Sequence, residues 1–140
     1  MKILSFGAGM QSTALALMSC DNAIAQTLGR PVPFPKVPVY DAVIICDLGF
    51  EPPWVQAQAD FVGQKCRSVG IFYTSLDAPL YQDLMRDFGK RRVVSIPWWT
   101  LSDDGHKSKM PRNCTLDYKV DLISKYVRWE LLGYRKGQRL

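Results

Sequence analysis

The chain opens with a strand pattern, a glycine turn and a helix pattern in direct succession. Residues 2–6 form a short, mostly apolar run that favours a buried strand, and residues 12–26 are rich in alanine and leucine, which favour a helix. Between them stand Gly7 and Gly9, which permit positive φ and carry no side chain that would keep a ligand from the backbone. Units of this kind build a parallel sheet with helices on its faces.

The same alternation continues through the chain. Further strand patterns lie at residues 42–46, 71–74 and 93–97, and further helix patterns at 53–68, 79–88 and 115–132. The run 42–46 is apolar throughout, which is typical of a central strand covered on both faces. Residues 31–38 contain four prolines and predict an extended connector. We expect one α/β domain over residues 1–133, followed by a basic tail at 134–140.

Composition narrows the classes of partner. A length of 140 residues with 47% hydrophobic content suits one domain with a core, and the net charge of +5 favours an anionic ligand, a nucleotide or a nucleic acid. The four cysteines include no Cys-x-x-Cys pair, so their spacing predicts no zinc or iron–sulfur site, and we expect no metal held by the protein itself. The first apolar run is too short for a signal peptide or a bilayer-spanning helix, so we expect a cytoplasmic protein without membrane contact.

The glycine turn has the features that a phosphate-binding loop needs. The start of a helix offers free N–H groups and the positive end of its dipole, which together attract anions. Ser12 and Thr13 stand near that start, and their hydroxyls add donors. The alternative is an ordinary turn without a ligand, because neither the Walker pattern nor the three-glycine dinucleotide pattern is present.

Polar clusters follow at two more places. Asp47 and Gly49 come directly after the run 42–46, where the carboxylate could accept hydrogen bonds from a nucleoside or cap the next helix. Arg112, Cys114 and Lys119 open the last helix, where the cations could clamp phosphate and lower the pKa of the thiol, or form a solvated helix start. Because ligands lie beyond the carboxyl ends of parallel strands, we expect the three clusters to converge.

In their order and chemistry, the three clusters resemble the PP-loop superfamily of adenine nucleotide α hydrolases. Within it they are most similar to the phosphoadenosine phosphosulfate reductase-like group, which includes small phage and bacterial proteins. The signature Ser-Gly-Gly-x-Asp-Ser, preceded by Ser-Phe, resembles residues 5–12; the Asp-Thr-Gly region resembles 47–52; and Arg-x-Cys-x-x-x-x-Lys resembles 112–119. The resemblance spans most of the chain and implies a Rossmann-like, HUP-type sheet, mostly parallel, with helices on both faces.

The resemblance also implies a site and a reaction. Members that cleave ATP between its α- and β-phosphates, with Mg²⁺, form AMP and pyrophosphate and activate an acceptor. Arg112, Lys119 and Cys114 would be the catalytic residues. The nucleotide-binding residues would be Ser5, Phe6, Gly7, Ala8, Gly9, Gln11, Ser12, Thr13, Asp47, Gly49 and Glu51.

Departures from the signature keep three further functions open. Gly7 occupies the position of the signature serine, Ala8 that of a glycine and Gln11 that of the acidic residue. A glutamine there is compatible with the sulfonucleotide reductase branch, which binds phosphoadenosine phosphosulfate, although that branch's Glu-Cys-Gly-x-His segment is absent. The chain could also be a nucleotide-binding module without catalysis, or could bind nucleic acid through the basic tail. The acceptor and a homo-oligomeric state stay open, and we expect the chain to be a piece of a longer protein.

Overall fold

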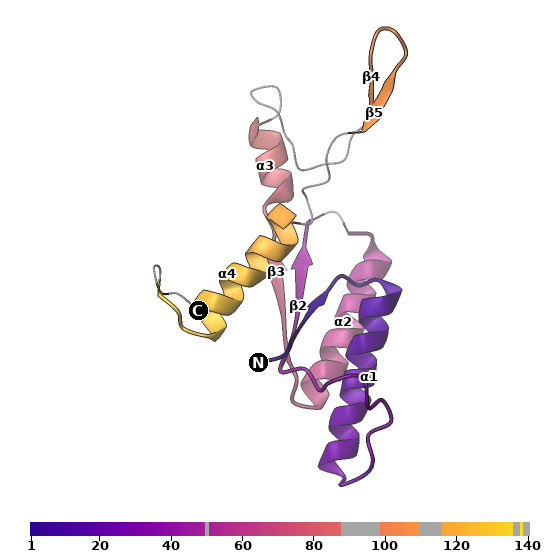
Figure 1. Ribbon diagram of the computed structural model, residues 1–140, viewed down its shortest axis with the longest axis vertical. Helices are drawn as coiled ribbons and strands as arrows, with labels where there is room; N and C mark the ends of the chain where they lie inside the picture. The colour runs from indigo at the N-terminus through magenta and orange to yellow at the C-terminus, as the bar shows by residue number, and fades with distance from the viewer. Residues whose placement is uncertain (50, 88–98, 110–115, 136–137, 139–140) are drawn as a thin grey trace. The chain divides into compact units, whose positions relative to one another are not determined.

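The computed structural model describes residues 1–49, 51–87, 99–109, 116–135 and 138 (Figure 1). The chain divides into two compact units, Met1–Leu76 and Asp77–Leu140. The strand expected at residues 93–97 lies outside the described residues, and the single domain over residues 1–133 stays a prediction. None of the helices in the described ranges is long and apolar enough to cross a membrane.

A three-stranded parallel sheet forms the centre of the first unit. Its strands are β1 (Ile3–Phe6), β2 (Ala42–Asp47) and β3 (Phe72–Asp77), in the order β1-β2-β3. In the parallel pair of β1 and β2, Ile3 lies opposite Ala42 and Phe6 opposite Ile45. Figure 1 shows β3 running in the same direction as β2. The expected α/β class with a parallel sheet is therefore confirmed.

The central strand β2 is buried on both of its faces. Val43 and Ile44 point to opposite faces, and each is 0% exposed. This confirms the prediction from the unbroken apolar run, because a strand with one wet face would alternate apolar and polar residues.

Two helices cover one face of this sheet, α1 (Met10–Thr27) and α2 (Pro53–Ser68). Leu4 and Val43 on the strands join a core cluster with small side chains of the helices, which are Ala16, Cys20 and Ala23 on α1 and Ala59 and Cys66 on α2. The Sγ atoms of the two cysteines are 3.8 Å apart, so the helices approach closely. The hydrogen bond with Cys20 and burial raise the pKa of the Cys66 thiol, which therefore stays protonated at neutral pH.

Tyr73 on β3 fills a slot on α2 that only a glycine leaves open. Its hydroxyl donates a hydrogen bond of 2.9 Å to the Ala59 carbonyl. The Phe6 ring packs edge-on against the Tyr73 ring, with 6.4 Å between the ring centres. The Arg67 guanidinium lies 5.1 Å from the centre of the ring, and burial raises the pKa of Tyr73 to about 12. A Cβ on Gly63 would lie 2.8 Å from a ring carbon of Tyr73. The absence of a side chain at residue 63 thus lets β3 pack onto α2.

We predict that Gly63→Ala destabilises the protein, although alanine is normally the better helix former. The clash should lower the free energy of unfolding by about 1–3 kcal/mol, measured by urea denaturation. Gln64→Ala, at the exposed neighbouring position, is the control and should change stability little. In a Tyr73→Leu background the penalty of Gly63→Ala should shrink. A Gly63→Ala variant more stable than the wild type would contradict the slot.

The proline-rich connector is held against α1 by two buried polar side chains. The Asn22 amide donates to the carbonyls of Phe34 at 2.8 Å and Val37 at 2.7 Å, and its oxygen accepts from the Phe34 N–H at 3.0 Å. The Ser19 hydroxyl accepts from the Tyr40 N–H at 2.9 Å. These bonds satisfy backbone groups that the prolines leave without a regular partner. The connector therefore belongs to the first unit, Met1–Leu76.

We predict that Asn22→Leu loosens the connector. The variant leaves the Val37 carbonyl and the Phe34 N–H without their partner, whereas the Phe34 carbonyl still accepts from the Val37 N–H at 3.0 Å. The free energy of unfolding should fall by about 2–4 kcal/mol. Trypsin should cleave faster after the exposed Lys36. Gln26→Leu, at an exposed position on the same helix, is the matched control. Unchanged cleavage and stability in Asn22→Leu would show that the connector is held by other contacts.

The second unit contains helices and a hairpin. These are α3 (Leu80–Asp87), the antiparallel strands β4 (Trp99–Leu101) and β5 (Lys107–Lys109), and a helix of three sections, Leu116–Val120, Asp121–Tyr126 and Val127–Leu131. The first and last of these sections are π-helical, and the middle one is α4. The Tyr118 hydroxyl donates to the Asp83 carboxylate at 3.1 Å and joins the last helix to α3. The two expected helices are present, and the sequence patterns did not predict the hairpin.

Candidate functional site

A hollow of about 560 Å³ opens where β1 ends and α1 begins. This volume falls in the range of about 300–1,000 Å³ that small-molecule sites occupy. The hollow is lined by Ser5, Gly7, Gly9, Met10, Gln11 and Ser12. The structure thus brings together five of the residues that the sequence assigned to the nucleotide, and it adds Met10.

Neither backbone conformation nor packing within the protein requires a glycine at residue 7 or residue 9. Gly7 and Gly9 are absent from the described residues with positive φ, so the expectation that they serve such a conformation is wrong. A Cβ built on either one would meet no atom within 4 Å. Neither positive φ nor packing requires a glycine at these two positions, which both line the hollow.

The left-handed residue of the turn is Ala8, with φ of 51°. Its methyl group is buried in the core cluster together with Phe6. An alanine in this conformation costs about 1 kcal/mol relative to a glycine, which has no Cβ penalty. Phe6 and Ala8 therefore hold the turn from inside, and neither lines the hollow as a nucleotide-binding residue would.

We predict that Ala8→Val destabilises the protein and that Ala8→Gly changes its stability little. Ala8→Val should lower the free energy of unfolding by about 2–4 kcal/mol, because a β-branched residue is strained at positive φ and overfills the core. Ala8→Gly should stay within about 1 kcal/mol of the wild type, since relief of strain offsets a lost methyl group. Ala14→Val inside α1 is the control for the β-branched side chain. Equal stability of Ala8→Val and wild type would refute the left-handed turn.

The first residues of α1 line the hollow, and their backbone N–H groups precede the first helical hydrogen bond. In the described part of the chain no side chain caps this helix, and its first turn holds no acidic residue. The first helical bond runs from the Thr13 N–H to the Gly9 carbonyl at 3.0 Å, and the Ser12 hydroxyl donates to the same carbonyl at 3.1 Å. The N–H groups of the first turn and the positive end of the dipole are thus available to an anion. No charged side chain is among the described residues that line the hollow.

Thr13 contacts the neighbouring helix instead of the hollow. Its hydroxyl accepts a hydrogen bond of 2.6 Å from the side-chain amide of Gln58 on α2. A glutamine on a helix carries no sequence signal for such a bond, so the sequence alone does not predict a role for Gln58. The bond ties the first turn of α1 to the second turn of α2.

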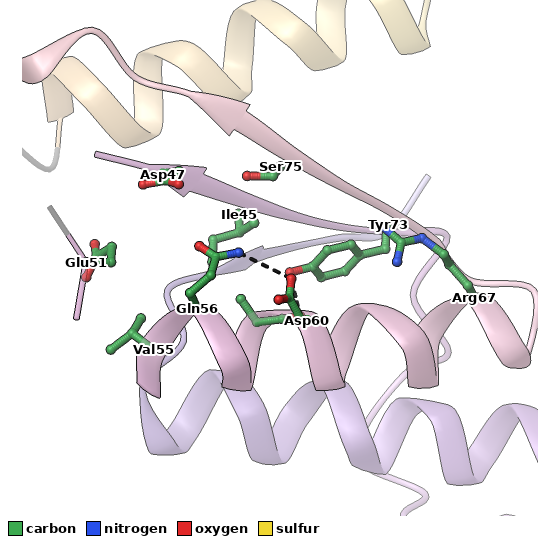
Figure 2. A pocket seen from close by; sticks show the side chains of 10 residues that line it. Ile45, Asp47, Glu51, Val55, Gln56, Asp60, Arg67, Tyr73 and Ser75 are labelled. Carbon is green, nitrogen blue, oxygen red and sulfur yellow. Dashed lines mark hydrogen bonds between the residues drawn. The ribbon is translucent and has the colours of Figure 1, made fainter. Parts of the chain in front are cut away.

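The loop after β2 lies beside a second hollow, which Figure 2 shows from close by. This hollow has a volume of about 100 Å³ and contains Asp47, Glu51 and Asp60 with one cation, Arg67. The Gln56 amide donates to Asp60 at 3.2 Å, and Tyr73 closes the side next to Arg67. Three carboxylates against one guanidinium make this hollow unsuited to phosphate.

Asp47 does not cap the helix that follows it. Its carboxylate accepts from the Gly49 N–H at 2.7 Å, and Gly49 has φ of 81°, which favours glycine. No side chain caps α2, so the capping interpretation is wrong for Asp47 among the described residues. The carboxylate and the glycine instead form the turn itself. Asp47 and Glu51 line the second hollow, and the first hollow is lined by different residues.

The third cluster is described only in part. Arg112 and Cys114 lie outside the described residues, and Lys119 lies in the section Leu116–Val120 of the second unit. Convergence of this cluster on the first hollow stays a prediction.

The described residues do not fit a resident Mg²⁺. They contain no group of three or more His, Cys, Asp or Glu residues able to hold a metal ion. The first hollow offers hydroxyls and an amide, whereas Mg²⁺ in proteins is held through one or two carboxylates with substrate phosphates.

Comparison of the chain with protein-family models, with curated proteins and with solved structures finds no match. The functional interpretation therefore depends on the geometry of the hollow and on the order of the motifs.

Proposed function

We propose that the first unit binds the polyphosphate of an adenine nucleotide in the hollow at the start of α1. The observation that supports this most directly is the pair Gly7 and Gly9, whose missing side chains neither φ nor packing requires. They lie at a helix start whose N–H groups no described side chain caps. Phosphate oxygens are the acceptors that such a site attracts. The preference for adenine comes from the resemblance to PP-loop proteins.

The arrangement of the sheet supports this proposal. Strands in the order β3-β2-β1 with two connecting helices on one face correspond to half of a doubly wound, Rossmann-like sheet. In such folds the ligand lies beyond the carboxyl ends of the strands, which is where the hollow opens. A HUP-type fold is part of the proposal.

The proposed reaction is the cleavage of ATP between its α- and β-phosphates. An acceptor oxygen attacks the α-phosphorus, the bond to the bridging oxygen breaks, and pyrophosphate leaves while the acceptor carries AMP. With water as the acceptor the products are AMP and pyrophosphate. Arg112, Cys114 and Lys119 are the proposed catalytic residues, with the two cations neutralising charge on the phosphates.

The binding site is tested by a charge placed at the helix start. Met10→Glu adds an acid at an exposed position of the first turn, where it favours the helix dipole but repels a polyanion. We expect the affinity for ATP, measured by calorimetry with and without Mg²⁺, to fall roughly tenfold or more, while the free energy of unfolding rises by about 0.3–1 kcal/mol. Gln64→Glu makes the same charge change on an exposed part of α2 and should alter neither quantity.

The products distinguish the proposed reaction from competing functions. AMP and pyrophosphate, separated by ion-exchange chromatography after incubation with ATP and Mg²⁺, are the expected result, and ADP with phosphate would contradict it. Tighter binding of phosphoadenosine phosphosulfate than of ATP would favour the reductase branch. Binding without turnover would favour a module without catalysis. Failure of the full chain to bind either nucleotide would overturn the proposal.

A further inference from the structure

Two large apolar side chains are exposed at the helix starts of the first unit. Trp54 in the first turn of α2 is 72% exposed, and Met10 in the first turn of α1 is 87% exposed. An indole contributes more contact area than almost any other side chain when a ligand or the core covers it. In Trp54 this area faces solvent.

The contacts between α1 and α2 bring Trp54 to the level of Gly9, which lines the first hollow. The hydrogen bond between Gln58 and Thr13 defines a first level, at which these two residues lie side by side. The contact between Cys66 and Cys20 defines a second level, about two turns further along both helices. The helices therefore run parallel and in register. One turn before the first level, a step of about 5.4 Å, the residues on the facing sides are Trp54 and Gly9.

The distance between the two helix starts suits a nucleotide. The axes of packed helices lie about 8–10 Å apart. The backbone of Trp54 is therefore separated from the first N–H groups of α1 by about this distance. A nucleoside with its phosphates spans more than this separation. A ligand with its phosphates at the start of α1 can therefore reach the ring of Trp54.

The second hollow is a poor candidate for the base. Its volume of about 100 Å³ is below the roughly 300 Å³ at which small-molecule sites begin. It is also lined by three carboxylates, which disfavour the nearby phosphates of the same ligand.

We propose that the indole of Trp54 stacks on the purine base of the nucleotide whose phosphates occupy the first hollow. This inference rests on the proposed function and places the base away from Asp47, where the resemblance put the nucleoside. Stacking of a base on an aromatic side chain raises affinity by roughly tenfold or more. It does not depend on which base is present, so recognition of adenine itself requires other groups.

The experiment compares ATP with inorganic tripolyphosphate, which carries the phosphates without a base. In calorimetry on the full chain, Trp54→Ala should weaken ATP binding roughly tenfold or more and leave the affinity for tripolyphosphate within about twofold. Trp54→Phe keeps an aromatic face and should retain most of the affinity for ATP. Phe61→Ala removes another exposed aromatic side chain of α2, two turns further on, and is the matched control that should change neither affinity. Urea denaturation of each variant verifies that it is folded.

Each outcome decides between the two proposals. Equal affinity of Trp54→Ala and the wild type for ATP would overturn the stacking. An equal loss of affinity for ATP and for tripolyphosphate in Trp54→Ala would overturn it as well. Failure of the wild type to bind either ATP or tripolyphosphate would overturn the phosphate site itself. As a second readout, ATP should quench the tryptophan fluorescence of the wild type more than that of Trp54→Phe, and tripolyphosphate should quench neither.

Discussion

Close packing of α1 on α2, against one face of the sheet, is the constraint on which the rest of the first unit depends. Alanine and cysteine side chains at the contact let the helices approach until the sulfur atoms of Cys20 and Cys66 are 3.8 Å apart. The Thr13–Gln58 hydrogen bond then sets the level of the two helix starts. Because both helices follow parallel neighbouring strands, their starts lie at the same edge of the sheet. The hollow, its N–H donors and the exposed Trp54 all derive their places from this pair.

Glycines in the first unit have different physical reasons, and the difference supports the proposed site. Gly63 is needed because the Tyr73 ring occupies the space of its Cβ. Gly49 is needed because its φ is positive. Gly7 and Gly9 have neither reason, and their missing side chains widen an anion-attracting helix start. A bound phosphate chain would supply the reason that the protein's own atoms do not.

The two hollows of the first unit differ in the charge they favour. The first holds no charged side chain among its described lining residues and depends on backbone N–H groups and the dipole of an 18-residue helix. The second is lined by three carboxylates and one guanidinium. A polyanion is favoured in the first and opposed in the second. This difference in charge is why we propose that the base lies on the indole of Trp54 rather than near Asp47.

Local patterns in the sequence determined the elements of this protein. The run 42–46 became β2 and the pattern 53–68 became α2, because an unbroken apolar run and helical periodicity are properties of neighbouring residues. The glycine turn, its position between strand and helix and five residues of the hollow were also readable in this way. The tertiary structure decided the rest. Ala8, and not a glycine, has the left-handed conformation. The Thr13 hydroxyl accepts a hydrogen bond from Gln58, and Asp47 lines the second hollow. The conformation of Ala8 accompanies burial of its methyl group in the core, and the other two depend on contacts between elements far apart in the chain. Local sequence patterns encode none of these.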